Sequence, residues 1–126
     1  MQLSNIITPE RILSSLDGAS KKRVLELTAE FIAEESQIDS EEIYQGLIDR
    51  ERLGSTGIGY GVAIPHCRVT SLGDDETRGY LVQLNQGVDF DSIDGQNVEL
   101  LFVLLVPEST NQVHLNLLAQ LADCFS

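Results

Sequence analysis

The hydrophobic and polar positions of the chain follow a helical period in two segments of its first half. Ser20 is expected to cap a helix that extends to about Glu35, because apolar side chains recur there on a single stripe. That stripe comprises Val24, Leu25, Thr28, Phe31 and Ile32. Asp39 or Ser40 is expected to cap the next helix, which reaches about Arg52. Its inward face comprises Ile43, Leu47 and Ile48.

Helices are also predicted towards both ends of the chain. Thr8 and Pro9 predict a short helix that ends near Asp17, with Thr8 as the cap and Pro9 in the first turn. Thr110 or Asn111 is expected to cap a last helix that continues to the C-terminal residue.

The segments between these helices have the patterns of loops and strands. Residues 54–61 hold four glycines, which disfavour a helix, so we expect a loop that ends in an extended piece at 62–64. Further strands are expected at 79–84, 88–90 and 98–106, with a turn at Asp94-Gly95 and an end at Pro107. The last strand is almost continuously apolar, which indicates burial on both of its faces. Helices before and after several strands predict an α/β fold with helices packed on a mixed sheet.

Length, composition and charge narrow the class of protein. The chain has 126 residues, 42% hydrophobic and 22% charged, which suits one globular domain. It lacks a signal-peptide pattern and any apolar stretch near the roughly 18 residues that span a bilayer, so we expect a cytoplasmic protein. With 8 basic and 20 acidic residues the net charge is −12. This balance disfavours nucleic acid and an anionic membrane as partners, and it is compatible with a basic protein.

Three side chains are candidates for a functional site. His66 follows Pro65 and the glycine-rich segment, where backbone N–H groups can approach an anion closely. His114 lies on the apolar stripe of the last helix, near a helix N-terminus that attracts anions. Arg50 ends the helix before the glycines, where a guanidinium can reach phosphate oxygens. Each residue also fits a structural role, as a surface histidine, a core histidine and a solvated cation, respectively.

Other kinds of site fit the spacing less well. The run Gly57–Gly61 is followed by Pro65 where a dinucleotide-binding loop would begin a helix. A hydrolytic triad with Ser55 or Cys67 stays open on composition, although the chain has no Gly-x-Ser-x-Gly motif. Cys67 and Cys124 form no Cys-x-x-Cys pair, and we expect reduced thiols, no metal and no cofactor.

One long segment resembles a known family. From Arg50 to His66 the chain reads Arg-Glu-Arg-Leu-Gly-Ser-Thr-Gly-Ile-Gly-Tyr-Gly-Val-Ala-Ile-Pro-His. This segment closely resembles enzyme IIA domains of the fructose/mannitol class of the sugar phosphotransferase system. The run Asn111–Leu115, which contains His114, is similar to the family's second histidine motif. Leu3–Ile7 is similar to the nitrogen-regulatory branch.

The resemblance implies a fold and a set of site residues. The fold is the mannitol-type enzyme IIA fold, a mixed parallel and antiparallel sheet of about five strands flanked by helices on both sides, with 1–126 as one domain. Nε2 of His66 would accept a phosphoryl group, His114 would hydrogen-bond its oxygens, and Arg50 would supply positive charge. The supporting residues would be Thr56, Gly59, Gly61 and Pro65, with Thr56 orienting a histidine ring through its hydroxyl.

The resemblance also implies partners. In the nitrogen branch a histidine phosphocarrier protein supplies the phosphoryl group, and phosphorylation state governs binding to targets that include potassium-transport components and sensor kinases. In the sugar branch the phosphoryl group passes to an enzyme IIB. A binding module that keeps the fold without carrying a phosphoryl group is the third alternative.

The chain departs from the family pattern at three places. Tyr60 stands where relatives often have a polar residue, and Cys67 stands where they often have a small one. The chain ends at Cys124-Phe125-Ser126 without a helix-stop signal, whereas relatives continue into further helix. We therefore expect a missing C-terminal helical end, with either a frayed last turn or an apolar patch covered in a homodimer.

Overall fold

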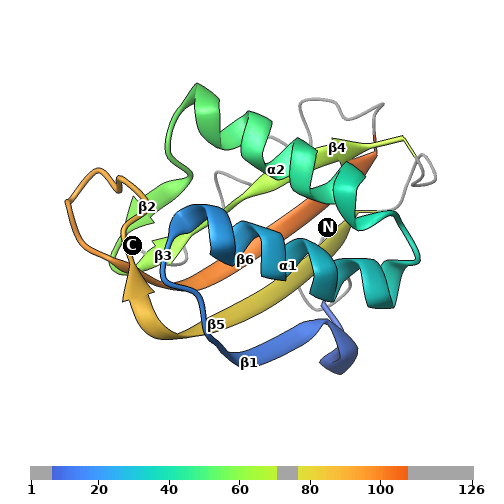
Figure 1. The fold of residues 1–126 in the computed structure, drawn as a ribbon, viewed down its shortest axis with the longest axis horizontal. Coiled ribbons are helices and arrows are strands. Elements are labelled where there is room, and N and C mark those ends of the chain that lie inside the picture. The colour runs from blue at the N-terminus through green and yellow to red at the C-terminus, as the bar shows by residue number, and fades with distance from the viewer. Residues whose placement is uncertain (1–6, 71–76, 108–126) are drawn as a thin grey trace.

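The computed structural model describes residues 7–70 and 77–107, which form a mixed sheet with a layer of helices (Figure 1). Six strands take the order β1-β5-β6-β3-β2, and β4 pairs with β6 beside this path. They are β1 (Ile12–Leu16), β2 (Gly57–Gly59), β3 (Val62–Ala63), β4 (His66–Val69), β5 (Arg78–Val88) and β6 (Val98–Pro107). The α/β fold with a mixed sheet is confirmed, with one strand more than the five expected.

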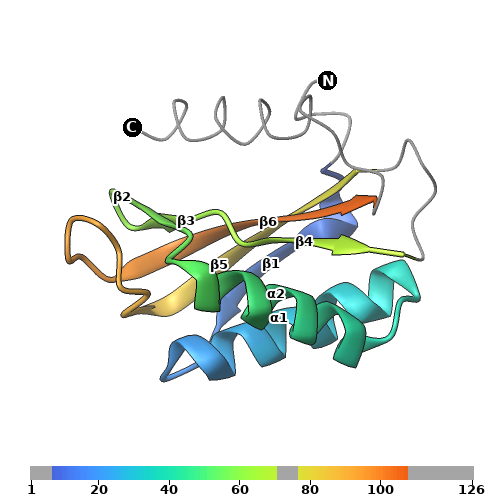
Figure 2. The ribbon, with the colours of Figure 1, turned by 90° about the horizontal axis from the view of Figure 1, so that it is seen from above.

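Both predicted long helices are confirmed, and both lie on one face of the sheet (Figure 2). They are α1 (Lys21–Ser36) and α2 (Ser40–Leu53). The Ser20 hydroxyl accepts a hydrogen bond from the backbone N–H of Arg23 at 3.2 Å, so it caps α1 as expected. Asp39 caps α2 through the N–H of Glu41 at 3.4 Å. The helix predicted at the C-terminal end lies outside the described residues.

The helix predicted from Thr8 to Asp17 is wrong beyond its first turn. A single 3-10 turn, η2 (Pro9–Arg11), is followed at once by β1. Ile12 and Leu13 pair in parallel with Leu81 and Val82 of β5. Pairing with a distant strand therefore overrides the local helix-start signal, as tertiary contacts commonly do for short segments.

The glycine-rich loop contains more strand than the sequence indicated. β2 and β3 form a tight antiparallel hairpin in which Gly59 pairs with Val62. Its two central residues, Tyr60 and Gly61, have φ values of 59° and 77°, as a type I′ turn requires. The strand expected at 79–84 is confirmed as part of β5, which extends to Val88 with an irregular register between Gln83 and Val88. The separate strand expected at 88–90 is wrong, because only Val88 belongs to a strand. The turn near Asp94-Gly95 is confirmed by the hydrogen bond from Gly95 N–H to Ser92 O at 2.9 Å.

The central strand β6 is buried on both faces, as its continuous apolar sequence predicted. Leu101, Val103 and Leu105 belong to the core shared with the helices. Phe102, Leu104 and Val106 belong to a second cluster on the other face. β6 is antiparallel to β5 and parallel to both β3 and β4. Both β3 and β4 are thus attached to the most buried strand of the sheet.

Replacing Gly46 with alanine should destabilise the fold, against the usual effect of this change in a helix. A Cβ at Gly46 of α2 would lie 2.8 Å from the Cβ of Cys67 in β4, and a Cβ cannot rotate away. Overpacking of this kind costs about 1–3 kcal/mol, more than the ~0.5–1 kcal/mol that alanine contributes to helix stability. Urea denaturation measures the difference, with Gln45→Ala as the exposed control. A stabilised Gly46→Ala variant would contradict the tight α2–β4 contact.

Candidate functional site

His66 lies at the start of β4, and backbone contacts fix the chain just before it. The N–H of Ile64 donates to the carbonyl of Thr56 at 2.9 Å, and the carbonyl of Pro65 accepts from Leu104 N–H at 3.0 Å. His66 itself is in register with Leu104 of β6. Pro65 also restricts the backbone just before the histidine. The half-buried ring therefore projects from a segment with little freedom to move.

Both ring nitrogens of His66 have a defined partner. Arg50 Nε lies 3.3 Å from His66 Nε2, and Nδ1 lies 3.3 Å from the carbonyl oxygen of Ile64. An arginine N–H can only donate, so Nε2 must be the acceptor. The carbonyl can only accept, so the proton is on Nδ1. We infer the neutral tautomer whose lone pair is on Nε2 and directed towards the Arg50 guanidinium.

The surroundings of His66 favour this neutral ring. Burial lowers the pKa of His66 below its ordinary value of 6.5, and the Arg50 and Arg68 charges act in the same direction. The hydrogen bond to Ile64 and the Glu51 carboxylate raise the pKa, but their combined effect is smaller. At neutral pH the imidazole is therefore unprotonated at Nε2, which is the state of a nucleophile.

The lowered pKa of His66 predicts a loss of stability on acidification. Between the lowered pKa and 6.5, the unfolded chain binds more protons at this residue than the folded chain does. The contribution of His66 to the free energy of unfolding is therefore fully present above pH 6.5. It is lost as the pH falls from 6.5 through the lowered pKa of the folded state. We expect His66→Gln to remove this part of the pH slope, as measured by urea denaturation between pH 5 and 7.5. An unchanged slope, or an NMR titration of His66 above 6.5, would contradict the assignment.

Arg50 is held beside the ring by a second contact. Its Nη1 donates to the carbonyl of Gly54 at 2.8 Å, one turn further along the end of α2. The guanidinium is therefore oriented by the helix end while its Nε faces His66. A cation in this position can contact oxygens of an anion that is bonded to Nε2. The structure thus brings together His66 and Arg50, two of the three candidate residues, whereas His114 lies outside the described residues.

The predicted supporting residues shape the backbone of the site. The hydroxyl of Thr56 is buried and donates to the Glu51 carboxylate. Among the described residues the partner of this hydroxyl is Glu51 and not the His66 ring, and its orientation of His114 stays a prediction. Gly59 has a φ of 95° in the hairpin, and Gly61 accepts from Glu99 and Leu100 through its carbonyl. Gly59 and Gly61 therefore set the geometry of the loop.

Sequence reasoning missed Glu51 and Lys21. The Glu51 carboxylate is buried, accepts from Thr56 and lies 2.9 Å from the Lys21 ammonium. A signal was present in the spacing, since Ile43, Leu47 and Glu51 follow each other at intervals of four residues and all are buried.

The two unusual residues of the motif differ in accessibility. Cys67 is buried against α2, and burial together with the Glu42 charge raises the pKa of its thiol to about 12. This favours the structural interpretation of Cys67 over an oxidation-sensitive one. Tyr60 is 69% exposed at the tip of the hairpin, where its N–H donates to Asp94 at 3.0 Å. Its ring is therefore on the surface and available to a partner.

Two further observations concern metals and membranes. In the described part of the chain no three His, Cys, Asp or Glu side chains lie close enough to hold a metal ion. Within residues 7–70 and 77–107 no helix has the length and apolar character to cross a membrane.

Comparisons with known proteins point to one family. Residues 5–126 match the family described as phosphoenolpyruvate-dependent sugar phosphotransferase system, EIIA 2. A nitrogen regulatory protein of Pseudomonas aeruginosa is 48% identical over 97% of this chain and 79% of its own length. The nitrogen regulatory protein of Escherichia coli K12 is 40% identical over 97% of this chain and 74% of its own length.

Solved structures agree with this similarity. The nitrogen regulatory protein IIA-Ntr of Neisseria meningitidis superposes with a TM-score of 0.87 at 36% identity, covering 96% of this chain and 82% of that one. The IIA mannitol protein of Escherichia coli has a TM-score of 0.73 at 22% identity, with 93% and 81% covered. A complex of enzyme IIA mannitol with phosphorylated enzyme IIB mannitol from the same species aligns at 0.68 and 19% identity, with 88% and 76% covered. The two mannitol structures show a shared fold.

Proposed function

Because this chain belongs to the EIIA type 2 family of the phosphoenolpyruvate-dependent sugar phosphotransferase system, among the nitrogen regulatory proteins, we propose that it carries a phosphoryl group on Nε2 of His66. One observation carries the proposal. The ring of His66 has its proton on Nδ1, bound to the Ile64 carbonyl, and its lone pair on Nε2 beside the Arg50 guanidinium. That is the arrangement needed for an imidazole to accept a phosphoryl group next to a cation.

The donor is a phosphohistidine of an upstream histidine phosphocarrier protein. The N–P bond of the donor breaks as a bond forms between Nε2 and phosphorus, and the donor imidazole leaves with the electron pair. For this to happen, Arg50 Nε–H must leave the lone pair of Nε2 and bind a phosphoryl oxygen instead. Donor and acceptor are both imidazoles, so the transfer is nearly balanced and reversible. His114 is proposed as a second donor to the phosphoryl oxygens.

Reconstitution of the transfer tests this function. The chain is incubated with phosphoenolpyruvate, enzyme I and a histidine phosphocarrier protein, and intact-mass measurement follows the adduct at neutral and acidic pH. We expect one phosphoryl group that is lost in acid, as a phosphohistidine is. The absence of any adduct, with a known enzyme IIA labelled in the same mixture, would refute the proposal.

We propose regulation of cytoplasmic targets as the outcome of this phosphorylation. The chain's similarity to nitrogen regulatory proteins at 40–48% identity supports the regulatory branch. Potassium-transport components and sensor kinases are the proposed targets. Delivery to an enzyme IIB is the second candidate, since a mannitol protein of the same fold forms a complex with its phosphorylated IIB.

Phosphorylation should weaken binding to a regulatory target that covers both His66 and the hairpin tip. The tip carries the exposed side chain of Tyr60, whose N–H donates to Asp94. Ile93, the residue before Asp94, is 89% exposed. A phosphoryl group adds about −1.5 to −2 charges to a chain whose net charge is already −12. Unless the target supplies a cation, covering that charge should weaken binding by roughly 10-fold or more.

Calorimetry with wild type, phosphorylated wild type and His66→Asp measures this difference for a candidate target. His66→Ala is the control for loss of the ring without added charge. Equal affinities for all four forms, together with efficient delivery to an enzyme IIB, would favour transport over regulation.

A further inference from the structure

Glu51 is a charged residue in a position that usually holds an apolar one. Its side chain is 2% exposed, on the α2 stripe that also buries Ile43 and Leu47. A carboxylate at such a site is costly unless it is paired and hydrogen-bonded. Packing alone does not explain a glutamate here, whereas the contacts of its carboxylate do.

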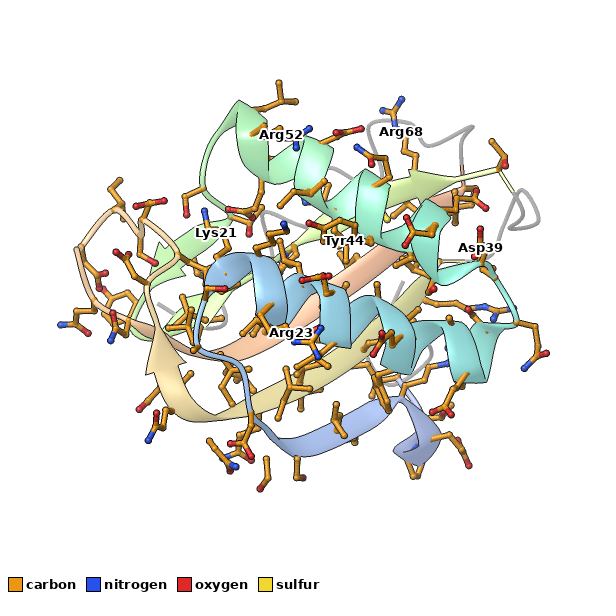
Figure 3. All side chains as sticks on the ribbon, viewed as in Figure 1. Lys21, Arg23, Asp39, Tyr44, Arg52 and Arg68 are labelled. Atoms are coloured by element: carbon orange, nitrogen blue, oxygen red, sulfur yellow. The ribbon has the colours of Figure 1, made fainter. Side chains whose placement is uncertain are left out.

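The partners of the Glu51 carboxylate come from two other parts of the fold. The Lys21 ammonium, from the first residue of α1, lies 2.9 Å from Oε2. The backbone N–H of Thr56 donates to both oxygens at 3.2 and 3.3 Å, and the Thr56 hydroxyl donates to Oε1. Figure 3 shows Lys21 at the start of α1, directed towards the segment that joins α2 to β2. Glu51 thus connects both helices to the start of the glycine-rich loop.

Lys21 is itself held in place. It lies 3.4 Å from the Asp91 carboxylate and 5.4 Å above the ring of Phe90. The Asp91 carboxylate is 80% exposed, whereas that of Glu51 is almost fully enclosed. The short contact to Glu51 is therefore the stronger of the two, because the low local dielectric strengthens it. This pairing gives the enclosed carboxylate of Glu51 a cationic partner.

From Glu51 the contacts lead to both nitrogens of the His66 ring, to Nδ1 through Thr56 and to Nε2 through Arg50. The carbonyl of Thr56 accepts from the N–H of Ile64, and the carbonyl of Ile64 faces Nδ1 of the ring. Nε2 faces Arg50, the neighbour of Glu51 in α2. The contacts form a closed path that leaves Glu51 through Thr56 and returns to it through Arg50. A displacement of Glu51 would move both partners of the ring.

We propose that Glu51 is a positioning residue for phosphoryl transfer, which fixes Thr56 and through it the carbonyl that orients the ring of His66. This inference rests on the proposed phosphorylation of His66. Glu51 does not touch the reacting atoms, so its contribution is the alignment of Nε2 with the incoming phosphorus and with Arg50. Alignment of this kind is sensitive, since a misplacement of about 1 Å costs up to ~100-fold in rate.

The test compares Glu51→Gln with Asp49→Asn, which neutralises an exposed carboxylate of the same helix turn. We expect Glu51→Gln to slow acceptance from the phosphocarrier by ~10- to 100-fold, and Asp49→Asn to leave the rate unchanged. Nitrogen-15 NMR of the unphosphorylated protein should show less of the Nδ1–H tautomer of His66 in Glu51→Gln. The pKa of His66 should fall further, because Glu51 raises it in the wild type.

If Glu51→Gln does not fold, the same contact is tested from its other side, at Thr56. The two variants are Thr56→Val and Thr56→Ser. Valine removes the hydroxyl bond to Glu51 at similar volume, and serine restores the hydroxyl. We expect a several-fold slower rate and a changed tautomer population with valine, and near wild-type behaviour with serine.

The outcomes separate this inference from the proposed function. Wild-type rates and tautomers in folded Glu51→Gln and Thr56→Val would overturn the inference. So would a slower rate with an unchanged His66 tautomer and titration, because that combination indicates a general structural role. If the wild type accepts no phosphoryl group, the proposed function fails, whereas the tautomer and titration still test whether Glu51 positions the ring.

Discussion

Replacement of His66 by alanine should abolish phosphorylation of the chain while leaving the fold intact. The proposed acceptor atom is Nε2 of this ring, which the alanine variant lacks. The side chain is only half-buried, and its neighbours in β4 keep their pairing with β6 through the backbone. The measurement is the mass of the chain after incubation with phosphoenolpyruvate, enzyme I and a phosphocarrier protein.

Circular dichroism and urea denaturation of His66→Ala provide the control for folding. His114→Ala serves as the comparison, because under the proposal His114 stabilises the phosphoryl group without accepting it. That variant should still be labelled, if more slowly. Full labelling of His66→Ala at another residue would refute the assignment of the acceptor.

The second large effect is expected from Arg50→Gln. In the unphosphorylated protein Arg50 Nε contacts His66 Nε2 at 3.3 Å, and Nη1 is anchored on the Gly54 carbonyl at 2.8 Å. We infer that the same guanidinium stabilises the charge that develops on the phosphoryl oxygens. Loss of one such donor commonly costs about 10²–10³ in rate, and we expect a loss of that size in rapid-quench measurements of transfer.

A matched control for Arg50 is available two residues along the same helix. Arg52 is exposed and pairs with Asp49, so Arg52→Gln removes the same charge without touching the ring. Arg50→Gln should also raise the pKa of His66, since Arg50 lowers it in the wild type. Equal rates for the two variants would show that Arg50 acts only through the net charge of the region.

The elements predictable from sequence were those whose apolar pattern is long and regular. α1, α2 and β6 each extend over ten residues or more, and each follows its expected boundaries within a few positions. β1 has five residues, and its state depends on pairing with β5, which local sequence does not encode. The β2–β3 hairpin was missed because glycine has low strand propensity and a tyrosine at positive φ is uncommon.

The site was predictable in part for a related reason. His66 and Arg50 were found through a long motif, and the structure brings their nitrogens together. Glu51 lies inside the same motif, yet a glutamate at the end of a helix is normally solvated. Only the combination of its spacing with Leu47 and a partner from α1 reveals that it is buried, and the sequence does not show which cation supplies the charge.

The attachment of His66 to β6 has a consequence for the chain as it is synthesised. The ring, Arg50 and the glycine-rich loop all precede β5, whereas the strand that holds the Pro65 carbonyl and the register of His66 follows it. Since translation proceeds from the N-terminus, the nascent chain displays its histidine well before it has the strand that fixes it. Competence to accept a phosphoryl group therefore depends on contacts between distant parts of the sequence, which form late. Incomplete or misfolded chains should therefore not accept phosphoryl groups from the donor. Targets should then not bind them as they bind the phosphorylated protein.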